Sequence, residues 1–507
     1  MLPASAAPRA GPIPVASTSA RIGIPVILAL ALAGCAVGPQ FRAPEVEESA
    51  GYRRDALPEA TVSAPVATGD AQRFLETADL PTRWWANFAS DELNRRVEQA
   101  LTHSPSIASA QAALRQAQAG VDAARGSLFP SLDANLGANR QNGLDAGLAD
   151  ASPFTLYNAG VGVSYTLDLF GGVRRGVQAQ SALADAQRHV LDGTYLSLAA
   201  NVTTTSILEA SLRAQIRATE EIAGLYAEQF ELTRKQNEIG AKSRTDVLLA
   251  QSQLAAANAE LPALRKALAQ THTQLAVYLG RYPSEVELAA LELDGLTLPV
   301  DVPVSLPSTL VRARPDIRAA EAQWHEASAR VGIATANLFP SITLSGSYGS
   351  QALSGGDLFV GGSQAWGLGL NLLQPIFRGG TLRAQKRAAE AGLDKAAADY
   401  RTTVLSAFQN VADALRALEL DAEGLRAQAA AEEATRSSLD LVRVQYEEGA
   451  TSYLQVIDAT RLYQQSRIGL IQARAARLAD TAALYAALGG SLRAASSARA
   501  DDTPISN

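Results

Sequence analysis

The chain carries one pattern twice, 210 residues apart, and this duplication limits its fold more than any other feature. Residues 103–132 align without a gap on residues 313–342, and twelve of the thirty pairs are identical. The identical pairs include the tetrad Leu-Phe-Pro-Ser, which occurs at 128–131 and again at 338–341. Chance similarity between alanine-rich helices does not keep proline and phenylalanine in step over a whole half. We therefore expect two structurally equivalent halves.

Each half should begin with a helix that ends at a Phe-Pro dipeptide. Pro105 and Pro315 stand at the first position of these helices, where the missing N–H of proline removes no hydrogen bond. The residue before a proline avoids the helical conformation, so the helices should end near Ser127 and Asn337.

Strict alternation of apolar and polar residues follows each of these helices. A period of two predicts strands that have one apolar and one polar face. We expect the strands at about 131–140, 156–169, 341–350 and 364–374. Their length matches the tilted strands of a membrane β-barrel, although a half-buried soluble hairpin alternates in the same way.

A long stretch without proline follows each pair of strands, from residue 173 to 238 and from residue 381 to 448. Apolar residues recur in the first stretch with a spacing of mostly three and four, which is typical of a packed or coiled helix. Each helix would be roughly 100 Å long.

A tight turn should end each long helix. Gly240 and Gly449 stand where a helix C-terminus favours glycine. Ser243 with Asp246, and Ser452 with a glutamine at the same distance, match the pattern of a capping box. We therefore expect a second helix to turn back from each long one.

The N-terminus has the features of a lipoprotein signal. An apolar stretch, 22–33, follows Arg21, and Leu-Ala-Gly precedes Cys35, the only cysteine. This order predicts a signal peptide over 1–34, after whose removal Cys35 carries a diacylglycerol and an N-acyl chain. The alternative is an ordinary signal peptide that happens to contain a cysteine. Ala36, where an aspartate would favour the inner membrane, favours the outer membrane.

The remaining residues divide into segments of different character. We place the first repeat at 84–280 and the second at 311–490. A proline- and leucine-rich connecting segment, 281–310, joins the repeats, an irregular leader spans 35–83, and 491–507 form a disordered tail. No later apolar run reaches the roughly 18 residues of a membrane helix, so any membrane crossing must use the strands.

Charge and residue types argue against nucleic-acid binding and against catalysis. The net charge is −7, whereas phosphate binding needs a basic surface. The four histidines lack metal-ligand spacing, and His325 with Glu321 and Glu326 fits an exposed helical face better than a metal site. The Gly-Gly pairs lack a P-loop lysine. We therefore expect no enzyme, no metal site and no nucleic-acid partner.

Four strands cannot close a barrel, and unpaired strand edges are not tolerated in lipid. A dimer would give eight strands with a filled interior, and a trimer would give twelve with room for a channel. The long helices would continue such a barrel as a helical tube across the periplasm.

The lipoprotein signal, the doubled order of elements and the two turns together resemble the TolC/OprM family of outer-membrane efflux proteins, from Trp84 to Gly490. The anchor makes the chain more similar to the OprM- and NodT-like lipoproteins of that family. The resemblance implies a mainly α-helical homotrimer, whose twelve-stranded β-barrel lies among outer-membrane lipids and continues as an α-helical periplasmic barrel. It also implies a passive conduit for drugs or toxic compounds, joined by a periplasmic adaptor protein to an inner-membrane RND-type transporter.

The segment 453–461 resembles the helix that lines the closed periplasmic aperture in this family. The resemblance assigns the gate to Leu454, Asp458 and Arg461, which share one helical face. Without it, the last two would indicate an ordinary surface ion pair. The contacts with the adaptor are assigned to residues of both turns: Gly240, Ser243, Asp246, Val247, Gly449 and Ser452.

Two other functions remain open. A duct for secreted proteins, as in type I secretion, would share this pattern, because the pump selects the substrate. A periplasmic coiled-coil scaffold lipoprotein without a pore would not need amphipathic strand pairs at matching positions in both halves.

Overall fold

The structure, a computed structural model, forms two compact units. The strand unit comprises Met1–Gln40, Ala123–Ala179 and Ser328–Ala391, and the helical unit comprises Phe41–Asp122, Gln180–Ala327 and Gly392–Asn507. Within them the structure describes residues 36–43, 51–76, 81–142, 153–304 and 307–489. The predicted signal peptide, Cys35 and the predicted tail 491–507 lie outside the described residues.

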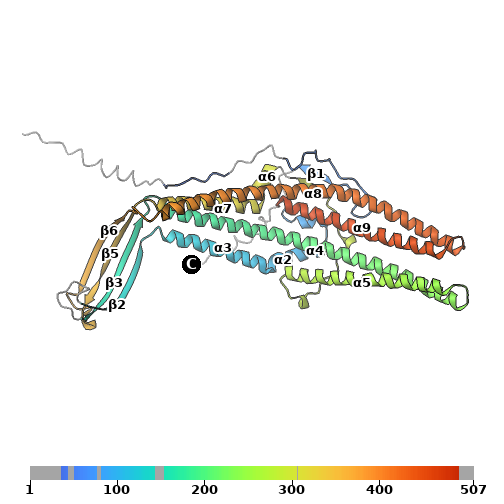
Figure 1. The fold of residues 1–507 in the computed structure, drawn as a ribbon, viewed down its shortest axis with the longest axis horizontal. Coiled ribbons are helices and arrows are strands. Elements are labelled where there is room, and N and C mark those ends of the chain that lie inside the picture. Colours follow the sequence, from blue (N-terminus) through green and yellow to red (C-terminus); the bar gives the residue numbers. More distant parts are fainter. Residues whose placement is uncertain (1–35, 44–50, 77–80, 143–152, 305–306, 490–507) are drawn as a thin grey trace, which may run out of the picture. The chain divides into compact units, whose positions relative to one another are not determined.

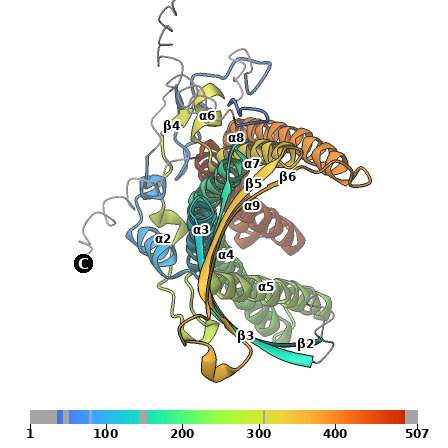
Figure 2. The ribbon, with the colours of Figure 1, turned by 90° about the vertical axis from the view of Figure 1, so that its left-hand side faces the viewer.

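One antiparallel sheet of four strands forms the centre of the strand unit (Figure 2). Its strands, in spatial order, are β2 (Ser131–Asn142), β3 (Pro153–Leu167), β5 (Ser341–Ala352) and β6 (Gln364–Leu373). The two hairpins join because β3 pairs with β5, from Tyr157 opposite Ala352 to Leu167 opposite Ile342. The outer edges of β2 and β6 have no neighbouring strand in the described part of the chain.

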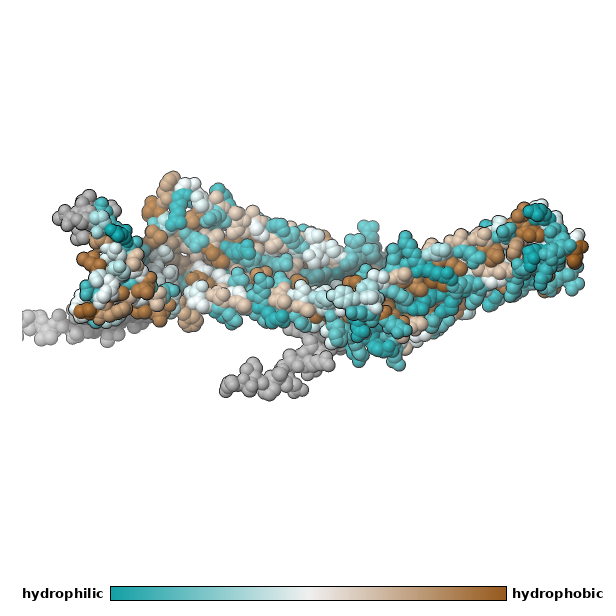
Figure 3. Space-filling model, turned by 90° about the horizontal axis from the view of Figure 1, so that it is seen from below, coloured by the Kyte–Doolittle hydropathy of each residue, from teal (hydrophilic) through white to brown (hydrophobic). Residues whose placement is uncertain are grey.

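Large apolar side chains of this sheet are exposed in the single chain. On β6, Trp366, Leu368 and Leu370 are 75%, 83% and 69% exposed, and they alternate with Gly367 and Gly369. Brown, hydrophobic residues accordingly reach the surface over the sheet (Figure 3). A contiguous apolar surface of this kind is typical of a face that meets lipid or another protein.

Helices follow the same order in both halves, as the duplication predicted (Figure 1). The first half has α3 (Pro105–Gly126), α4 (Gly172–Glu238) and α5 (Arg244–Tyr278); the second has α7 (Pro315–Ala336), α8 (Thr381–Glu447) and α9 (Tyr453–Leu488). The fold is therefore mainly helical with duplicated hairpins. No helix within the described residues is both long enough and apolar enough to cross a membrane.

The main core of the helical unit gathers residues from both ends of the chain. Before α2 (Asp91–His103), a 3₁₀ turn, Trp84–Phe88, buries its aromatic side chains, and Trp84 stacks on Tyr485 of α9 with ring centroids 5.5 Å apart. Large aromatic rings contribute the most apolar area per residue to a core. This cluster therefore links the start of the first repeat to the last helix.

The leader is more ordered than the sequence indicated, so the prediction of an irregular segment was wrong in part. β1 (Arg73–Glu76) pairs in parallel with β4 (Asp301–Val304) of the connecting segment, next to α6 (Pro307–Ala313). The guanidinium of Arg477, on α9, is fully buried and donates to the carbonyl oxygens of Thr68 and Asp70, at 3.1 and 2.6 Å. A buried charge needs such partners, and here the leader supplies them.

Candidate functional site

The turn between α4 and α5 is held by local hydrogen bonds. Gly240 has a φ of +76°, which favours glycine, and its N–H donates to the carbonyl of Asn237 at 2.9 Å. Ser243 and Asp246 form the predicted capping box: the N–H of Asp246 donates to Oγ of Ser243 at 3.2 Å, and the N–H of Ser243 donates to the Asp246 carboxylate at 3.0 Å. Hydrogen bonds from Ser243 lower the pKa of Asp246. Val247, the next residue, is half-buried.

The turn between α8 and α9 repeats this path with a different cap. Gly449 has a φ of +75°, and its N–H donates to the carbonyl of Tyr446 at 3.0 Å. The Ser452 side chain, however, makes no capping hydrogen bond, so the predicted capping box was wrong here. The hydroxyl of Thr451 donates to the side chain of Gln455 instead, which removes the glutamine from the box.

The three residues assigned to the gate lie on one exposed face of α9. The side chain of Leu454 is 57% exposed, and Nη2 of Arg461 lies 3.7 Å from Oδ1 of Asp458. An exposed ion pair of this kind stabilises a single chain by less than about 1 kcal/mol. The face is therefore free to meet other molecules, and its role stays a prediction.

The opposite face of α9 is buried, and the sequence analysis missed it. Tyr453, Val456 and Ile457 form a cluster with Ala250 of α5, against which side chains of α4 and α8 also pack. Burial raises the pKa of Tyr453 to about 12. The spacing of Tyr453, Val456, Ile457 and Thr460 is that of an apolar helical stripe and could have identified this face.

Polar contacts add to this packing between the two helical hairpins. Arg467 of α9 lies 2.5 Å from the carboxylate of Glu221 on α4, and Gln464 donates to Glu260 of α5 at 3.0 Å. Lys242 lies over the ring of Tyr446, 5.3 Å from its centroid. The α4–α5 and α8–α9 hairpins are thus held together near their turns by one apolar cluster and a few polar links.

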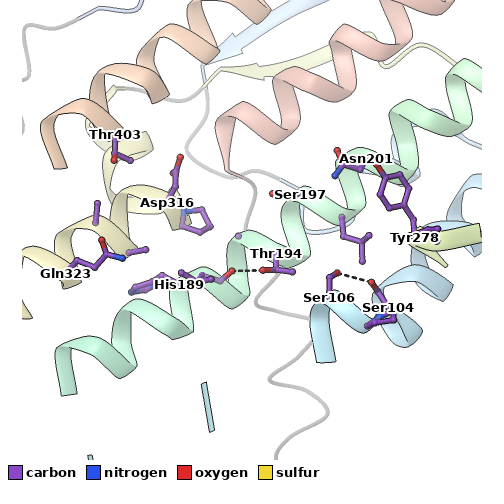
Figure 4. A pocket seen from close by; sticks show the side chains of 18 residues that line it. Ser104, Ser106, His189, Thr194, Ser197, Asn201, Tyr278, Asp316, Gln323 and Thr403 are labelled. Carbon is purple, nitrogen blue, oxygen red and sulfur yellow. Dashed lines mark hydrogen bonds between the residues drawn. The ribbon is translucent and has the colours of Figure 1, made fainter. Parts of the chain in front are cut away.

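A cleft of about 750 Å³ lies elsewhere in the helical unit (Figure 4). Its polar groups are mostly neutral hydroxyls and amides, among them Ser104, Thr194 and Asn201, and Thr194 donates to the carbonyl of Val190. Its one histidine, His189, lies 3.7 Å from Asp192 and near no activated nucleophile. Asp316 also lines the cleft, and its carboxylate accepts from the side chain of Arg314 at 2.9 Å.

His325, the histidine that the sequence analysis considered as a metal ligand, packs against an aromatic ring. Its ring stacks on Phe41 with centroids 4.7 Å apart, while Glu321 pairs with Arg318 at 3.4 Å. Within the described residues, no group of three potential ligands could hold a metal ion.

Comparison with known proteins gives consistent matches over most of the chain. The family model described as outer membrane efflux protein matches twice, at residues 97–281 and 306–490. The antibiotic efflux pump outer membrane protein ArpC of Pseudomonas putida is 31% identical over 470 residues, covering 92% of this chain and 94% of the relative. The pyoverdine export outer membrane protein OpmQ of Pseudomonas aeruginosa is 31% identical over 417 residues, or 80% and 87%.

Solved structures agree with this match. The outer-membrane channel OprN superposes with a TM-score of 0.80 at 29% identity, covering 90% of this chain and all of that one. The open state of the Neisseria gonorrhoeae MtrE outer membrane channel gives 0.76 at 29% identity, with 90% and 99% covered. Sequence and fold thus point to the same group of proteins.

Proposed function

The chain belongs to the outer membrane efflux protein family, and from this premise we propose that it is the trimeric, lipid-anchored outer-membrane duct of a tripartite efflux pump. Membership makes it an outer-membrane efflux channel and not an enzyme. The trimer is supported by the four-stranded sheet, whose two outer edges pair with no other strand of the described residues. Each unsatisfied backbone group in lipid costs several kcal/mol, so the edges of β2 and β6 need further copies. Three copies give twelve strands and a channel.

The anchor rests on the sequence of the N-terminus. Acylation of Cys35 would hold the chain at the outer membrane through its acyl chains while the sheet spans the membrane. Cys35→Ser is expected to abolish labelling with a radioactive fatty acid and to leave the signal peptide uncut. Labelling of the serine variant would refute the anchor and leave the channel unaffected.

The α9 face with Leu454, Asp458 and Arg461 fits the role of a periplasmic gate. Three copies of Asp458 converging on one axis would repel one another, and Arg461, 3.7 Å away in the single chain, would offset that charge. The two turns, from Gly240 to Val247 and from Gly449 to Ser452, would receive the adaptor, which in turn contacts an RND-type transporter. Opening of the gate would then require rearrangement of the contacts between the α4–α5 and α8–α9 hairpins.

The comparisons say less about the exported compound than about the channel itself. Relatives are named for antibiotic efflux, toluene efflux and pyoverdine export, at nearly the same identity of 31%. These names support small molecules, and they make a duct for secreted proteins or a scaffold without a pore the weaker alternatives.

Conductance in planar bilayers tests the gate. Arg461→Ala combined with Asp458→Ala should raise single-channel conductance severalfold, because the closed aperture loses its charge-assisted contacts. The control is Lys395→Ala with Asp399→Ala, which removes an exposed ion pair of 2.6 Å on α8. Equal conductance in the two variants, with intact trimers, would refute the gate; the absence of pores from wild-type protein would refute the duct.

A further inference from the structure

At the junction between β3 and α4 in the first repeat, the charged side chains form hydrogen bonds with neighbouring residues of the strand unit. The carboxylate of Asp168 accepts hydrogen bonds from the first-turn N–H groups of Val173 and Arg174, at 3.0 and 2.9 Å, and from the Arg174 side chain. Arg175 donates to the carbonyl oxygens of Val37 and Gly38, at 3.3 and 3.4 Å. Both arginines are therefore engaged within the strand unit.

The equivalent junction between β6 and α8 has no such carboxylate. Pro375 stands two residues before Phe377, as Asp168 stands two before Phe170. Four cations follow: Arg378 just before α8, and Arg383, Lys386 and Arg387 in the first turns of α8. Lys386 has an ion pair, 3.0 Å from Glu390, whereas the guanidinium groups of the three arginines make no hydrogen bond or ion pair with the described residues.

Apolar side chains stand directly beside this charge. Ile376 and Phe377 are 90% and 87% exposed, whereas Phe170 of the first repeat stacks on Phe339 with centroids 4.6 Å apart. A shallow cleft lined by Gly379, Gly380, Thr381 and Arg387 opens at the same place, and a Cβ on either glycine would meet nothing. Residues 376–387, the basic junction, thus combine an exposed apolar edge, a cleft and unpaired cations.

We propose that the basic junction binds the headgroup of an anionic phospholipid in the periplasmic leaflet of the outer membrane. The order along the chain matches the order of depths in a bilayer: apolar strand residues, then an aromatic ring, then arginines at the headgroups. Guanidinium groups bind phosphate oxygens through paired hydrogen bonds, and three of them here lack an internal partner. This inference rests on the proposed function, because only a membrane-spanning sheet brings β6 to that depth.

Lipid retention by the purified full-length trimer tests the proposal. Native mass spectrometry in a neutral detergent should show preferential retention of phosphatidylglycerol over phosphatidylcholine, with affinity falling as salt rises. Arg378→Ala, Arg383→Ala and Arg387→Ala together should weaken phosphatidylglycerol binding by at least about tenfold, since each cation near a membrane surface contributes to the attraction. The same three positions changed to lysine should keep most of the preference.

A matched control removes three cations further along α8, through Lys395→Ala, Arg401→Ala and Arg426→Ala, and should leave the preference unchanged. Equal retention by the basic-junction variant and the wild type would overturn the proposal. So would displacement of the lipid by equimolar inorganic phosphate, which would indicate a phosphate site. Loss of the trimer with unchanged lipid preference would also overturn it, and would indicate that a second copy of the chain covers the junction.

Planar-bilayer recordings on the same preparations test the lipid site and the channel function separately. Wild-type pores without a preference for phosphatidylglycerol would refute only the lipid site. Wild-type protein that forms no pores would refute the proposed function itself.

Discussion

The two repeats share a backbone plan but place charged side chains at different positions of it. Glu209 and Leu418 occupy the same place in two helices of 67 residues each, and both are fully buried. Glu209 accepts hydrogen bonds from Arg96 at 2.5 Å and Arg213 at 2.8 Å, and pairs with His272 at 3.0 Å. Duplication thus preserved the helices while the first repeat turned its charges inward and the second left its arginines exposed at the basic junction.

The second repeat has a half-buried acid, Asp421, in a different setting. Burial and the neighbouring Asp480 of α9 raise the pKa of Asp421 to about 7, although Arg477 lowers it. One carboxylate oxygen of Asp421 is buried without a hydrogen-bond partner. For Glu209, burial also raises the pKa, but the charge of Arg96 and three hydrogen bonds bring it below its ordinary value. Burial raises the pKa of both carboxyl groups, so the charged neighbours account for the different outcome at Glu209 and Asp421.

The largest effect should come from the charged network of the first repeat. Glu209→Gln removes the fully buried carboxylate that pairs with Arg96, which keeps only the less buried Glu92 as an anionic partner, so the free energy of unfolding should fall by about 3 kcal/mol. Urea unfolding in detergent measures it. Glu220→Gln on the same helix is the control, because its pair with Arg265 is exposed and should contribute less than about 1 kcal/mol. Equal losses would show that the first repeat does not depend on its internal charges.

The half-buried Asp421 of the second repeat should make the free energy of unfolding depend on pH. The folded pKa of Asp421 is raised, so its contribution is present at low pH and is lost as pH rises through about 7. Asp421→Asn should therefore be more stable than the wild type at pH 8, by about 1–2 kcal/mol, and the difference should shrink through pH 5 and disappear near pH 4, the ordinary pKa of an aspartate. Asp413→Asn, at an exposed position of α8, should show no such change. A wild-type stability that is flat between pH 5 and 8 would contradict the assignment.

The smallest effect should distinguish the two turns. Ser243→Ala removes a capping box and should destabilise α5 by about 1 kcal/mol, whereas Ser452→Ala removes no cap and should cost less than about 0.5 kcal/mol. Hydrogen exchange in the first turns of α5 and α9 measures both. Because the pKa of Asp246 is lowered, the advantage of the wild type over Ser243→Ala should fade as pH falls below about 4. Equal protection in both variants would mean that the caps do not differ.

The parts of the fold that could be predicted from the sequence are those fixed by neighbours along the chain. Helix and strand periods, the breaks at Phe-Pro and the glycines of both turns depend on local sterics, and the observed elements follow them within a few residues. The cap at Ser452 was predicted wrongly, because Thr451 competes for the same glutamine. Local pattern does not settle such competition between adjacent hydroxyls.

The parts that could not be predicted depend on distant partners. The order in the leader requires Arg477, and the burial of Glu209 requires Arg96, which lies more than a hundred residues away in the sequence. The gate residues on the exposed face of α9 were assigned from the family resemblance, whereas the buried face at Tyr453 was found only in the structure. The arginines of the basic junction could be recognised as unpaired only by comparison with the first repeat, where Arg174 and Arg175 have hydrogen-bond partners.

The contact between the leader and Arg477 has a consequence for the timing of assembly. Thr61 and Asp70 meet a side chain more than four hundred positions later, so this contact cannot form until nearly the whole polypeptide has been made and exported. Contacts of such sequence separation are slow to form, because a large loop must close first. Residues 61–70 are thus made early but reach their final contacts late. During that interval the apolar side chains of the sheet stay exposed, and a partly folded chain with open strand edges is prone to aggregation.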